Sequence, residues 1–509
     1  MLARLQSVTL EGIEGVVCEV EVDVARGGLE KSIIVGLPDA AVKESVERVR
    51  SAITNSGYRY PRTQSLVNLA PADIKKVGPA FDLPIALGIL MGEGVLISEV
   101  VKDCVIIGEL ALDGRVRPVN GVLSMAMTAA AGGFKRMIVP LDNAKEAAVV
   151  RDVEVYGVGS LAQTVAFLSG KLLLEGTTVD IEELFNVASS YEVDFADVKG
   201  QENVKRALTV AAAGGHNIMM IGPPGAGKTM LAQRLATVLP PLSLEESLQT
   251  TRIYSAVGLL EKEKALMATR PVRSPHHSAS GVALVGGGTT PRPGELSLAH
   301  FGILFLDEFV EFPRHVLEMI RQPLEDGFVI VSRAKKTIRF PAQFMLVAAM
   351  NPCPCGYYGS NTRACKCTPA QIGRHLTRVS GPLVDRIDIH VDVPTVGFHK
   401  LRSRSSQLGS AAIRQSVLQA REIQTCRFGD GKVMTNARMS HKQVEKYCTL
   451  DSAGEMLLKQ AMVELGLSAR AHDKVCKVAR TIADLAGVEA IQPEHLAEAI
   501  SYRKLDRKL

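Results

Sequence analysis

The sequence lacks a long uninterrupted apolar segment. Its most apolar stretch, 81–97, is broken by Asp82, Pro84 and Glu93, so it falls short of the roughly 18 consecutive apolar residues that a membrane-spanning helix needs. The first six residues soon turn polar, whereas a secretory signal peptide carries an apolar core. We therefore expect a cytoplasmic protein with no membrane partner.

A strong excess of one charge is also missing. The 509 residues include 59 Lys and Arg against 54 Asp and Glu, which gives a formal net charge of +5. This balance permits contact with nucleic acid but does not require it. The length and a hydrophobic content of 46% are enough for about two to four domains, each with its own core.

The cysteines do not form the pattern of a disulfide framework. Their number, nine, is odd, and five of them are scattered singly, which fits a reducing compartment. The other four form two Cys-x-Cys pairs, Cys353 with Cys355 and Cys365 with Cys367. A tetrahedral zinc site is one interpretation, because the loop has few apolar residues to order it. The spacing is tighter than the usual Cys-x2-Cys, so a reduced, metal-free loop stays open.

Alternating strand and helix patterns predict an α/β protein with several domains. An α/β domain is expected in 1–172, followed by a linker in 173–193. In 194–400, helices alternate with buried strands, the order typical of a parallel sheet with crossover helices. A linker helix in 401–439 and a helical bundle in 440–509 follow.

A glycine-rich loop between a strand and a helix predicts a nucleotide site. The pattern Gly-x4-Gly-Lys-Thr follows the apolar strand 217–221 and precedes a helical run from Met230, which is the setting that this phosphate-binding loop requires. Backbone N–H groups and the helix N-terminus would hold the phosphates of ATP, Lys228 would reach the β/γ oxygens and Thr229 would ligate Mg²⁺. The loop consists of Gly222, Pro223, Pro224, Gly225, Ala226, Gly227, Lys228 and Thr229.

Polar residues at the ends of two later strands fit the same chemistry. The apolar strand 303–306 ends in Asp307 and Glu308, of which Asp307 would hold Mg²⁺ and Glu308 would polarise the attacking water. Strand 344–349 is followed by Asn351, placed to orient that water. An asparagine after a strand is usually a turn residue, but its order after the other two motifs favours the functional interpretation.

Two arginines extend this set. Arg386 precedes the last core strand, and Arg470 begins a helix of the C-terminal bundle. Each is compatible with an ordinary surface residue. The functional alternative is that Arg386 is an arginine finger reaching a neighbouring subunit, while Arg470 couples the helical lid to the nucleotide state. The enzyme would then be active only as a ring.

Further motifs carry a resemblance to a known family. The segments Arg273 to Ser280 and Pro291 to His300, with the Leu306-Asp307-Glu308 end of the strand, resemble the magnesium-chelatase-like AAA+ ATPases. The fit is closer to the bacterial ComM/YifB branch, because the first 170 residues also match, so that the resemblance covers essentially the whole chain. It implies an AAA+ core with a helix-2 insertion directed toward a central pore, a C-terminal helical lid and a homo-hexameric ring.

The N-terminal domain looks like the proteolytic domain of Lon-type proteases, a ribosomal S5 domain 2-like fold. Ala80 stands where that family has its nucleophilic serine, and Leu123 stands where it has the catalytic lysine. A Ser/Lys dyad needs a hydroxyl and an amine, so we expect an inactive domain that serves assembly or DNA contact.

Within the expected core, 328–331 and 337–340 read as a hairpin whose tip carries Arg333, Lys335 and Lys336. It resembles the pre-sensor hairpin that helicases of this clade use to grip DNA phosphates. A solvated turn is the simpler interpretation, but like charges that converge on a pore need a polyanion. For the adjacent His276 and His277 we expect divergent side chains and a structural or pore-loop role.

The leading hypothesis is therefore an ATP-dependent ring motor for DNA, a helicase or branch-migration enzyme acting on recombination intermediates, as in natural transformation. One alternative is the motor subunit of a magnesium chelatase. Another is a protein-remodelling AAA+ ATPase, for which aromatic pore loops would be expected; the hairpin tip carries no aromatic residue.

Overall fold

The chain folds into two units, each described here by itself. The computed structural model describes residues 2–503 apart from 26, 28–30, 188–192, 262–263, 289, 334–335, 361–362, 398–407 and 430–434. The first unit comprises Met1–Ala188 with Ser243–Ala268, and the second comprises Ser189–Leu242 with Thr269–Leu509. Among the described residues, every helix is too short or too polar to cross a bilayer.

The first unit is built on a mixed sheet with the strand order β3-β4-β2-β1-β5-β8-β9. β1 (Leu2–Glu11) and β2 (Glu14–Val24) pair antiparallel along their whole length. Helices α2 (Asp82–Gly92) and α3 (Val122–Ala131) pack on these two strands, and α1 (Ala40–Asn55) packs on α2. The remaining strands are β3 (Lys31–Val35), β4 (Gln64–Ala70), β5 (Cys104–Ile106), β8 (Arg136–Pro140) and β9 (Glu154–Val158).

Helix α9 (Leu244–Ala256) belongs to the first unit, although the sequence alone placed all of 194–400 in the ATPase core. It begins at a capping box of Ser243 and Glu246 and packs against α3. Ser255 donates a hydrogen bond to the buried carboxylate of Glu146, which also accepts the backbone N–H of Leu123 at 2.8 Å. Burial raises the pKa of Glu146, and these donors oppose the rise.

Helix α6 (Ile181–Val187) lies inside the predicted linker 173–193 and belongs to the first unit. Ile181 is buried in a small apolar cluster with Leu123, Val149 and Leu266. Apolar side chains of α6 and of the segment after α9 are thus removed from water against α3. This burial is the physical reason why both segments join the first unit.

The second unit is built on a parallel sheet with the strand order β11-β14-β17-β10-β18. All residues of β10, β14 and β17 are buried, as expected at the centre of a parallel sheet. The predicted α/β fold class is confirmed. The strands are β10 (Ile218–Ile221), β11 (Val272–Arg273), β14 (Ile303–Leu306), β17 (Met345–Met350) and β18 (Ile389–Asp392).

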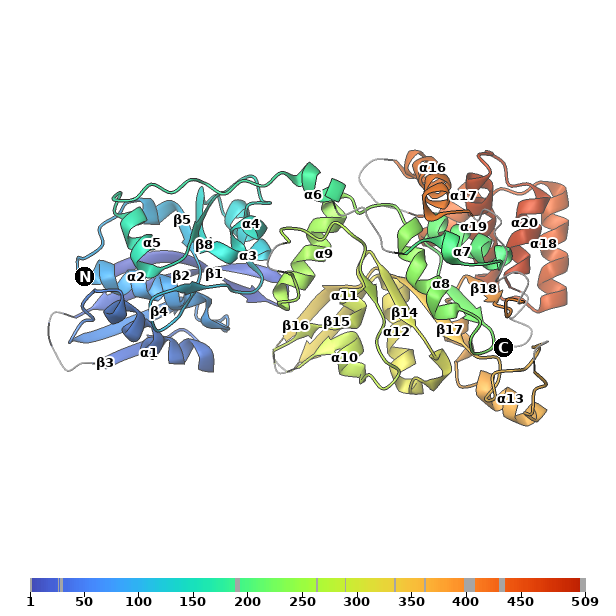
Figure 1. Cartoon of the computed structure of the whole chain (residues 1–509), viewed down its shortest axis with the longest axis horizontal. Helices are drawn as coiled ribbons and strands as arrows, with labels where there is room; N and C mark the ends of the chain where they lie inside the picture. The colour runs from blue at the N-terminus through green and yellow to red at the C-terminus, as the bar shows by residue number, and fades with distance from the viewer. Residues whose placement is uncertain are drawn as a thin grey trace. The chain divides into compact units, whose positions relative to one another are not determined.

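Helices of the C-terminal region share a core with this sheet and gather at one end of the second unit, orange to red in Figure 1. α16 (Ser410–Phe428), which the sequence placed in the linker 401–439, packs against α7 (Glu202–Gly214) and α19 (Ala469–Leu485). α20 (Pro493–Ser501) packs on both α18 (Ser452–Leu465) and α19, and α17 (His441–Tyr447) packs on α19.

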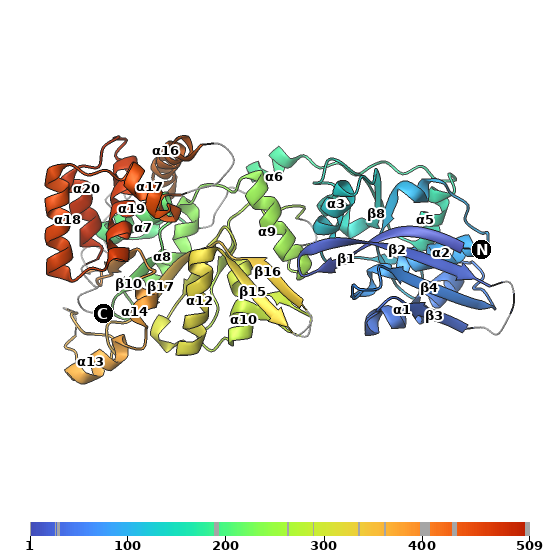
Figure 2. The ribbon, with the colours of Figure 1, turned by 180° about the vertical axis from the view of Figure 1, so that it is seen from behind.

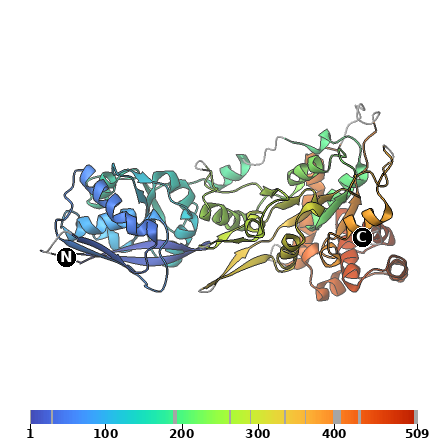
Figure 3. The same ribbon diagram turned by 90° about the horizontal axis from the view of Figure 1, so that it is seen from below.

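The predicted hairpin is present as a separate two-stranded sheet. β15 (Phe328–Arg333) follows α12 (Arg314–Asp326) and pairs antiparallel with β16 (Lys336–Pro341). Figure 3 shows the hairpin extending away from the lid helices. At another edge of the same unit, the cysteine-containing loop leads into α13 (Pro369–Leu376), which protrudes from the core in Figure 2.

Candidate functional site

Three neighbouring strands of the second unit end at the same edge of the sheet. β17 lies between β10 and β14, and all three are parallel, so their carboxyl ends meet. The loop 222–227 follows β10, Asp307 and Glu308 follow β14, and Asn351 follows β17. The strand order thus brings together residues that lie far apart in the sequence.

The loop after β10 keeps an open conformation that strongly favours glycine. Gly225 and Gly227 have φ angles of 76° and 88°, in the left-handed region that other residues rarely adopt. A Cβ at either position would meet nothing within 4 Å, so backbone conformation and not crowding requires the glycines. α8 (Lys228–Leu235) begins directly after the loop, and its first N–H groups, which have no acceptor within the helix, are available to an anion.

Lys228 connects this loop with the end of β17. Its Nζ donates hydrogen bonds to the carbonyl oxygens of Gly222 at 2.7 Å and Pro223 at 3.0 Å, and to Oδ1 of Asn351 at 3.1 Å. Burial lowers the pKa of Lys228, and the charge of Asp307 opposes this effect.

The two carboxylates after β14 have different partners. Asp307 Oδ2 accepts a hydrogen bond from Thr229 Oγ1 at 2.7 Å, while its Oδ1 accepts the backbone N–H of Glu308 at 2.9 Å. Glu308 has a φ angle of 50°, a left-handed conformation that is strained for a residue with a side chain and is often found at functional sites.

His277 is the partner of Glu308, with 3.0 Å between its Nδ1 and Oε2 of the glutamate. The expectation that His276 and His277 diverge was wrong, because their rings lie 4.1 Å apart. Sequence reasoning missed this contact with Glu308. The only indication of this contact was that His277 comes a few residues after β11, the strand that neighbours β14.

The segment between β11 and β14 is fixed by a two-pronged ion pair. Arg273 at the end of β11 donates to both carboxylate oxygens of Glu295, each at 2.7 Å, and such bidentate pairs are geometrically specific. Glu295 begins α11 (Glu295–Leu298), and α10 (Gly281–Val285) lies between the two residues in sequence. The ion pair therefore joins the motif 273–280, which contains His277, to the motif 291–300.

Gln201 is a second residue that sequence reasoning missed. Its Nε2 donates to the carbonyl oxygens of Ala226 in the loop, at 2.8 Å, and of Pro394 after β18, at 2.9 Å. Gln201 has a φ angle of 60°. The side chain fastens the loop after β10 to the segment that leaves the neighbouring strand.

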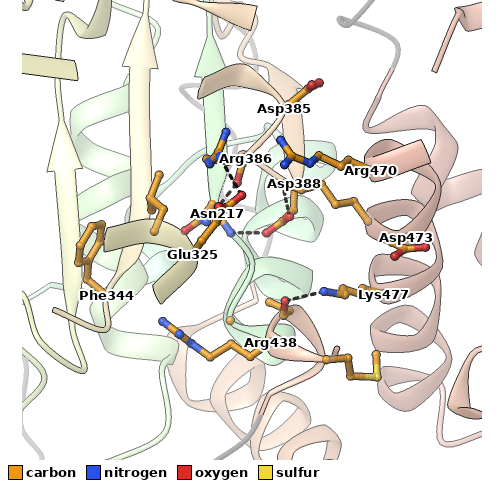
Figure 4. Close-up of a pocket in the computed structure, with 15 residues that line it drawn as sticks. Asn217, Glu325, Phe344, Asp385, Arg386, Asp388, Arg438, Arg470, Asp473 and Lys477 are labelled. Carbon is orange, nitrogen blue, oxygen red and sulfur yellow. Dashed lines mark hydrogen bonds and ion pairs between the residues drawn. The ribbon is translucent and has the colours of Figure 1, made fainter. Parts of the chain in front are cut away.

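Arg386 and Arg470 lie at the other edge of the sheet. Arg386 precedes β18, whereas the loop after β10 follows its strand, and the two strands are parallel. A strand of four residues spans about 13 Å, so Arg386 is separated from the loop of its own chain. Both arginines line one pocket of the second unit, in which Figure 4 shows them side by side. Arg386 pairs there with Glu325 at 2.8 Å.

Comparison with known proteins shows the family of the chain. Three family models match: magnesium chelatase subunit ChlI over 194–401, subunit ChlI of Mg-chelatase over 20–143, and the ChlI C-terminal model over 407–503. The competence protein ComM of Haemophilus influenzae is 44% identical over 100% of this chain and 98% of its own length. The uncharacterized protein YifB of Escherichia coli is 43% identical over 98% of this chain and 96% of its own. This chain belongs to the ComM/YifB family of magnesium-chelatase-like proteins.

Membership of the ComM/YifB family makes the chain an AAA+ ATPase and implies ATP and Mg²⁺. The residues fit both groups, since the loop is uncovered at its glycines and followed by a helix N-terminus, and the hydroxyl of Thr229 and the carboxylate of Asp307 are oxygen ligands of the kind that Mg²⁺ prefers. Lys228 and the loop N–H groups would hold the phosphates. When bound, Mg²⁺ would neutralise charge on the phosphates. The carboxylate of Glu308 and the side-chain amide of Asn351 follow the strands that end beside this phosphate and Mg²⁺ position.

Asp388 ties the ATPase sheet of this ComM/YifB member to its helical lid. Its Oδ2 accepts the backbone N–H of Asn217 at 3.0 Å, and its Oδ1 pairs with Lys474 of α19 at 2.8 Å. Burial alone would raise the pKa of Asp388, but the charge of Lys474 and the nearby His216, whose Nδ1 lies 3.7 Å from the carboxylate, hold that pKa well below its usual range. Because the pKa is depressed, the stabilisation is complete at neutral pH and is lost only as pH falls through the folded pKa.

Replacement of Asp388 by Ala should destabilise the second unit. Lys474 would remain nearly buried without its counter-charge, and breaking a buried ion pair in this way costs about 3–5 kcal/mol. Denaturant unfolding at neutral pH should therefore show a lower midpoint. Asp385→Ala, at a neighbouring carboxylate that makes no ion pair with a described residue, is the control and should shift the midpoint little. Equal effects of the two substitutions would contradict this role.

Three further sets of predicted residues are the hairpin tip, the four clustered cysteines and the two positions of the N-terminal domain. Lys335 lies outside the described residues, while Arg333 and Lys336 form the last register pair of the hairpin. The sulfur atoms of Cys353, Cys355, Cys365 and Cys367 lie within 4.8 Å of one another and could hold a metal ion. In the first unit, Ala80 and Leu123 are both buried, and neither supplies a nucleophile or a base.

Proposed function

We propose that this protein is the subunit of a ring-forming motor that uses ATP to move along DNA, as a helicase or branch-migration enzyme on recombination intermediates. The β15–β16 hairpin carries the proposal. Its register sets Arg333 opposite Lys336, and Lys335 lies between these two residues in the sequence. Like charges directly opposite each other destabilise a strand pair, so this arrangement is best explained by a polyanion that neutralises it, such as the DNA backbone.

The positions of the arginines support assembly into a ring. Arg386 and Arg470 share a pocket at the sheet edge opposite the phosphate-binding loop. In a head-to-tail ring, one face of each subunit meets a different face of the next, so these arginines would reach the nucleotide of a neighbour. We propose a homo-hexamer with Arg386 acting in this way and Arg470 responding to the same nucleotide.

A role in DNA uptake is supported by the name of one relative, since the Haemophilus influenzae protein is a competence protein. The chelatase alternative rests on the family models and on the magnesium-chelatase 38 kDa subunit of Rhodobacter capsulatus, which is 27% identical over 31% of this chain and 50% of its own length. That shorter match leaves out most of this chain. Binding of a porphyrin would favour the chelatase alternative.

The decisive experiment is phosphate release measured without DNA and with a panel of single strands, forks and four-way junctions. We expect ATP hydrolysis to rise several-fold with at least one of these DNAs. A rate that no DNA changes would overturn the proposal. A fluorescent strand-displacement assay on the same substrates would distinguish translocation from simple stimulation.

Removal of the hairpin charges should uncouple DNA from ATP hydrolysis. In the double variant Arg333→Ala/Lys336→Ala, we expect basal hydrolysis within about twofold of the parent and stimulation by DNA largely lost. If both residues contact phosphates, the slope of log affinity against log salt should become shallower by about 1.5. Fluorescence anisotropy at several salt concentrations measures this slope.

The matched control removes two exposed lysines from the lid helices, Lys442→Ala/Lys459→Ala. It lowers the net charge by the same amount, so it should show a smaller change in salt slope and normal stimulation. Equal losses in both double variants would mean that overall charge, and not the hairpin, governs DNA binding.

A further inference from the structure

The four clustered cysteines have the arrangement of a tetrahedral metal site. Sulfur–sulfur distances are 3.4 Å from Cys353 to Cys355, 3.7 Å from Cys353 to Cys365 and 3.5 Å from Cys355 to Cys365. In a site with Zn–S bonds of about 2.3 Å, tetrahedral geometry places the sulfur atoms about 3.8 Å apart. All four cysteines of the cluster are free thiols, and four thiolates around one point repel one another unless a cation lies between them.

Backbone N–H groups also point at these sulfur atoms. Tyr358 N donates to Cys353 Sγ at 3.3 Å, and Cys367 N donates to Cys365 Sγ at 3.4 Å. Hydrogen bonds of this kind stabilise the charged form of their acceptor and orient metal ligands. The loop therefore provides both the ligands and their supporting donors.

The loop that carries the cysteines is in contact with the nucleotide site. A Cβ on Gly356 would lie 2.6 Å from Cδ of Pro224, so the turn at Cys353 to Gly356 packs closely against the phosphate-binding loop. Cys353 stands two residues after Asn351 in the sequence. Asn351 in turn accepts a hydrogen bond from Lys228.

The far end of the cysteine loop returns to the same asparagine. Thr368 follows Cys367 and caps α13 through a capping box with Gln371. His375 of this helix is buried, and its Nε2 lies 3.0 Å from the backbone oxygen of Asn351. The loop thus starts next to Asn351 and returns to contact its backbone oxygen. The four cysteines bring the two halves of this loop together.

We propose that Cys353, Cys355, Cys365 and Cys367 bind one Zn²⁺, and that this ion positions Asn351 and the phosphate-binding loop for ATP hydrolysis. The cysteines are positioning residues, since they act through Asn351 and Pro224. Four thiolates are a ligand set that suits zinc. The same set could also hold an iron–sulfur cluster. The inference rests on hydrolysis of ATP by the chain and not on its action upon DNA.

The first test is the metal content of the purified full-length chain, measured by plasma mass spectrometry. We expect about one zinc per chain, released when a mercurial reagent titrates the thiols and detected with a zinc-binding dye. Cys367→Ser should lose the zinc, whereas Cys367→His, which keeps a ligand, should retain it. Cys426→Ser, at an exposed cysteine outside the cluster, is the control. Bound iron would overturn the zinc site. So would the absence of any metal, with the cysteines found as free thiols or disulfides by mass spectrometry.

The second test measures basal ATP hydrolysis and nucleotide binding without DNA, so that it is independent of the proposed motor function. For Cys367→Ser we expect kcat to fall at least tenfold, with binding of a fluorescent ATP analogue retained, and for Cys367→His we expect recovery of hydrolysis. Gly356→Ala should also lower kcat, because its Cβ would displace Pro224 and its φ angle of 83° is unfavourable for alanine. Normal hydrolysis in a zinc-free variant that stays folded by circular dichroism would overturn the coupling.

Discussion

Glu308→Gln is expected to retain ATP binding and to lose at least about 99% of ATP turnover. The substitution keeps the size of the side chain but removes the carboxylate that polarises water, and groups with such a role contribute about 10²–10⁴-fold. The amide can still face His277, which lies 3.0 Å from the glutamate, so the loop should keep its shape. Steady-state phosphate release and titration with a fluorescent ATP analogue measure the two properties separately.

The matched control for this prediction is Glu311→Gln. Glu311 lies three residues further along the same turn and pairs with Arg378 at 2.9 Å, an exposed contact that contributes little. Its turnover should stay near that of the parent. If Glu308→Gln hydrolysed ATP at the parent rate, the assignment of Glu308 as the residue that activates water would be wrong.

Two inactive variants should restore activity to each other when they are mixed. Lys228→Ala should lose nucleotide binding, and Arg386→Ala should keep binding but lose about 10³-fold in turnover, as arginine fingers do. Arg386 lies at the sheet edge opposite the phosphate-binding loop. In a mixed ring, the intact loop of one variant meets the intact arginine of the other, and an equal mixture should regain up to about a quarter of the parent rate.

The control mixture combines Lys228→Ala with the double variant Lys228→Ala/Arg386→Ala, which leaves every loop defective. No activity should return. If Lys228→Ala and Arg386→Ala also failed to complement each other after re-assembly, Arg386 would not act across a subunit boundary. A single variant Arg386→Ala with normal turnover would exclude the residue from the reaction altogether.

Several features were predictable because they depend on short stretches of chain. The strand, glycine loop and helix around Lys228 follow from local pattern, as do the buried strands that precede Asp307 and Asn351. The hairpin was also predicted, with strands at 328–331 and 337–340, and in the structure its strands are Phe328–Arg333 and Lys336–Pro341. In each case the residues that decide the conformation are neighbours in the sequence, so backbone preference and apolar period are sufficient evidence.

Other features could not be predicted because they depend on which segments pack together. The sequence did not show that α9, inside the predicted ATPase core, would bury its face against α3 of the first unit. It also did not show that His277 would meet Glu308 or that Gly356 would touch Pro224. These contacts require the order of strands in the sheet and the path of long loops.

By itself, the sequence determined the chemistry of this protein: a loop for phosphates, two carboxylates, an asparagine and four thiols. The tertiary structure alone decided how these groups are distributed. In a parallel sheet, the residues that follow the strands lie at one edge and those that precede the strands lie at the other. Lys228, Asp307 and Asn351 therefore share one edge, which Arg386 cannot reach within the same chain. That separation is a property of strand order, which is set by long-range burial of apolar surface.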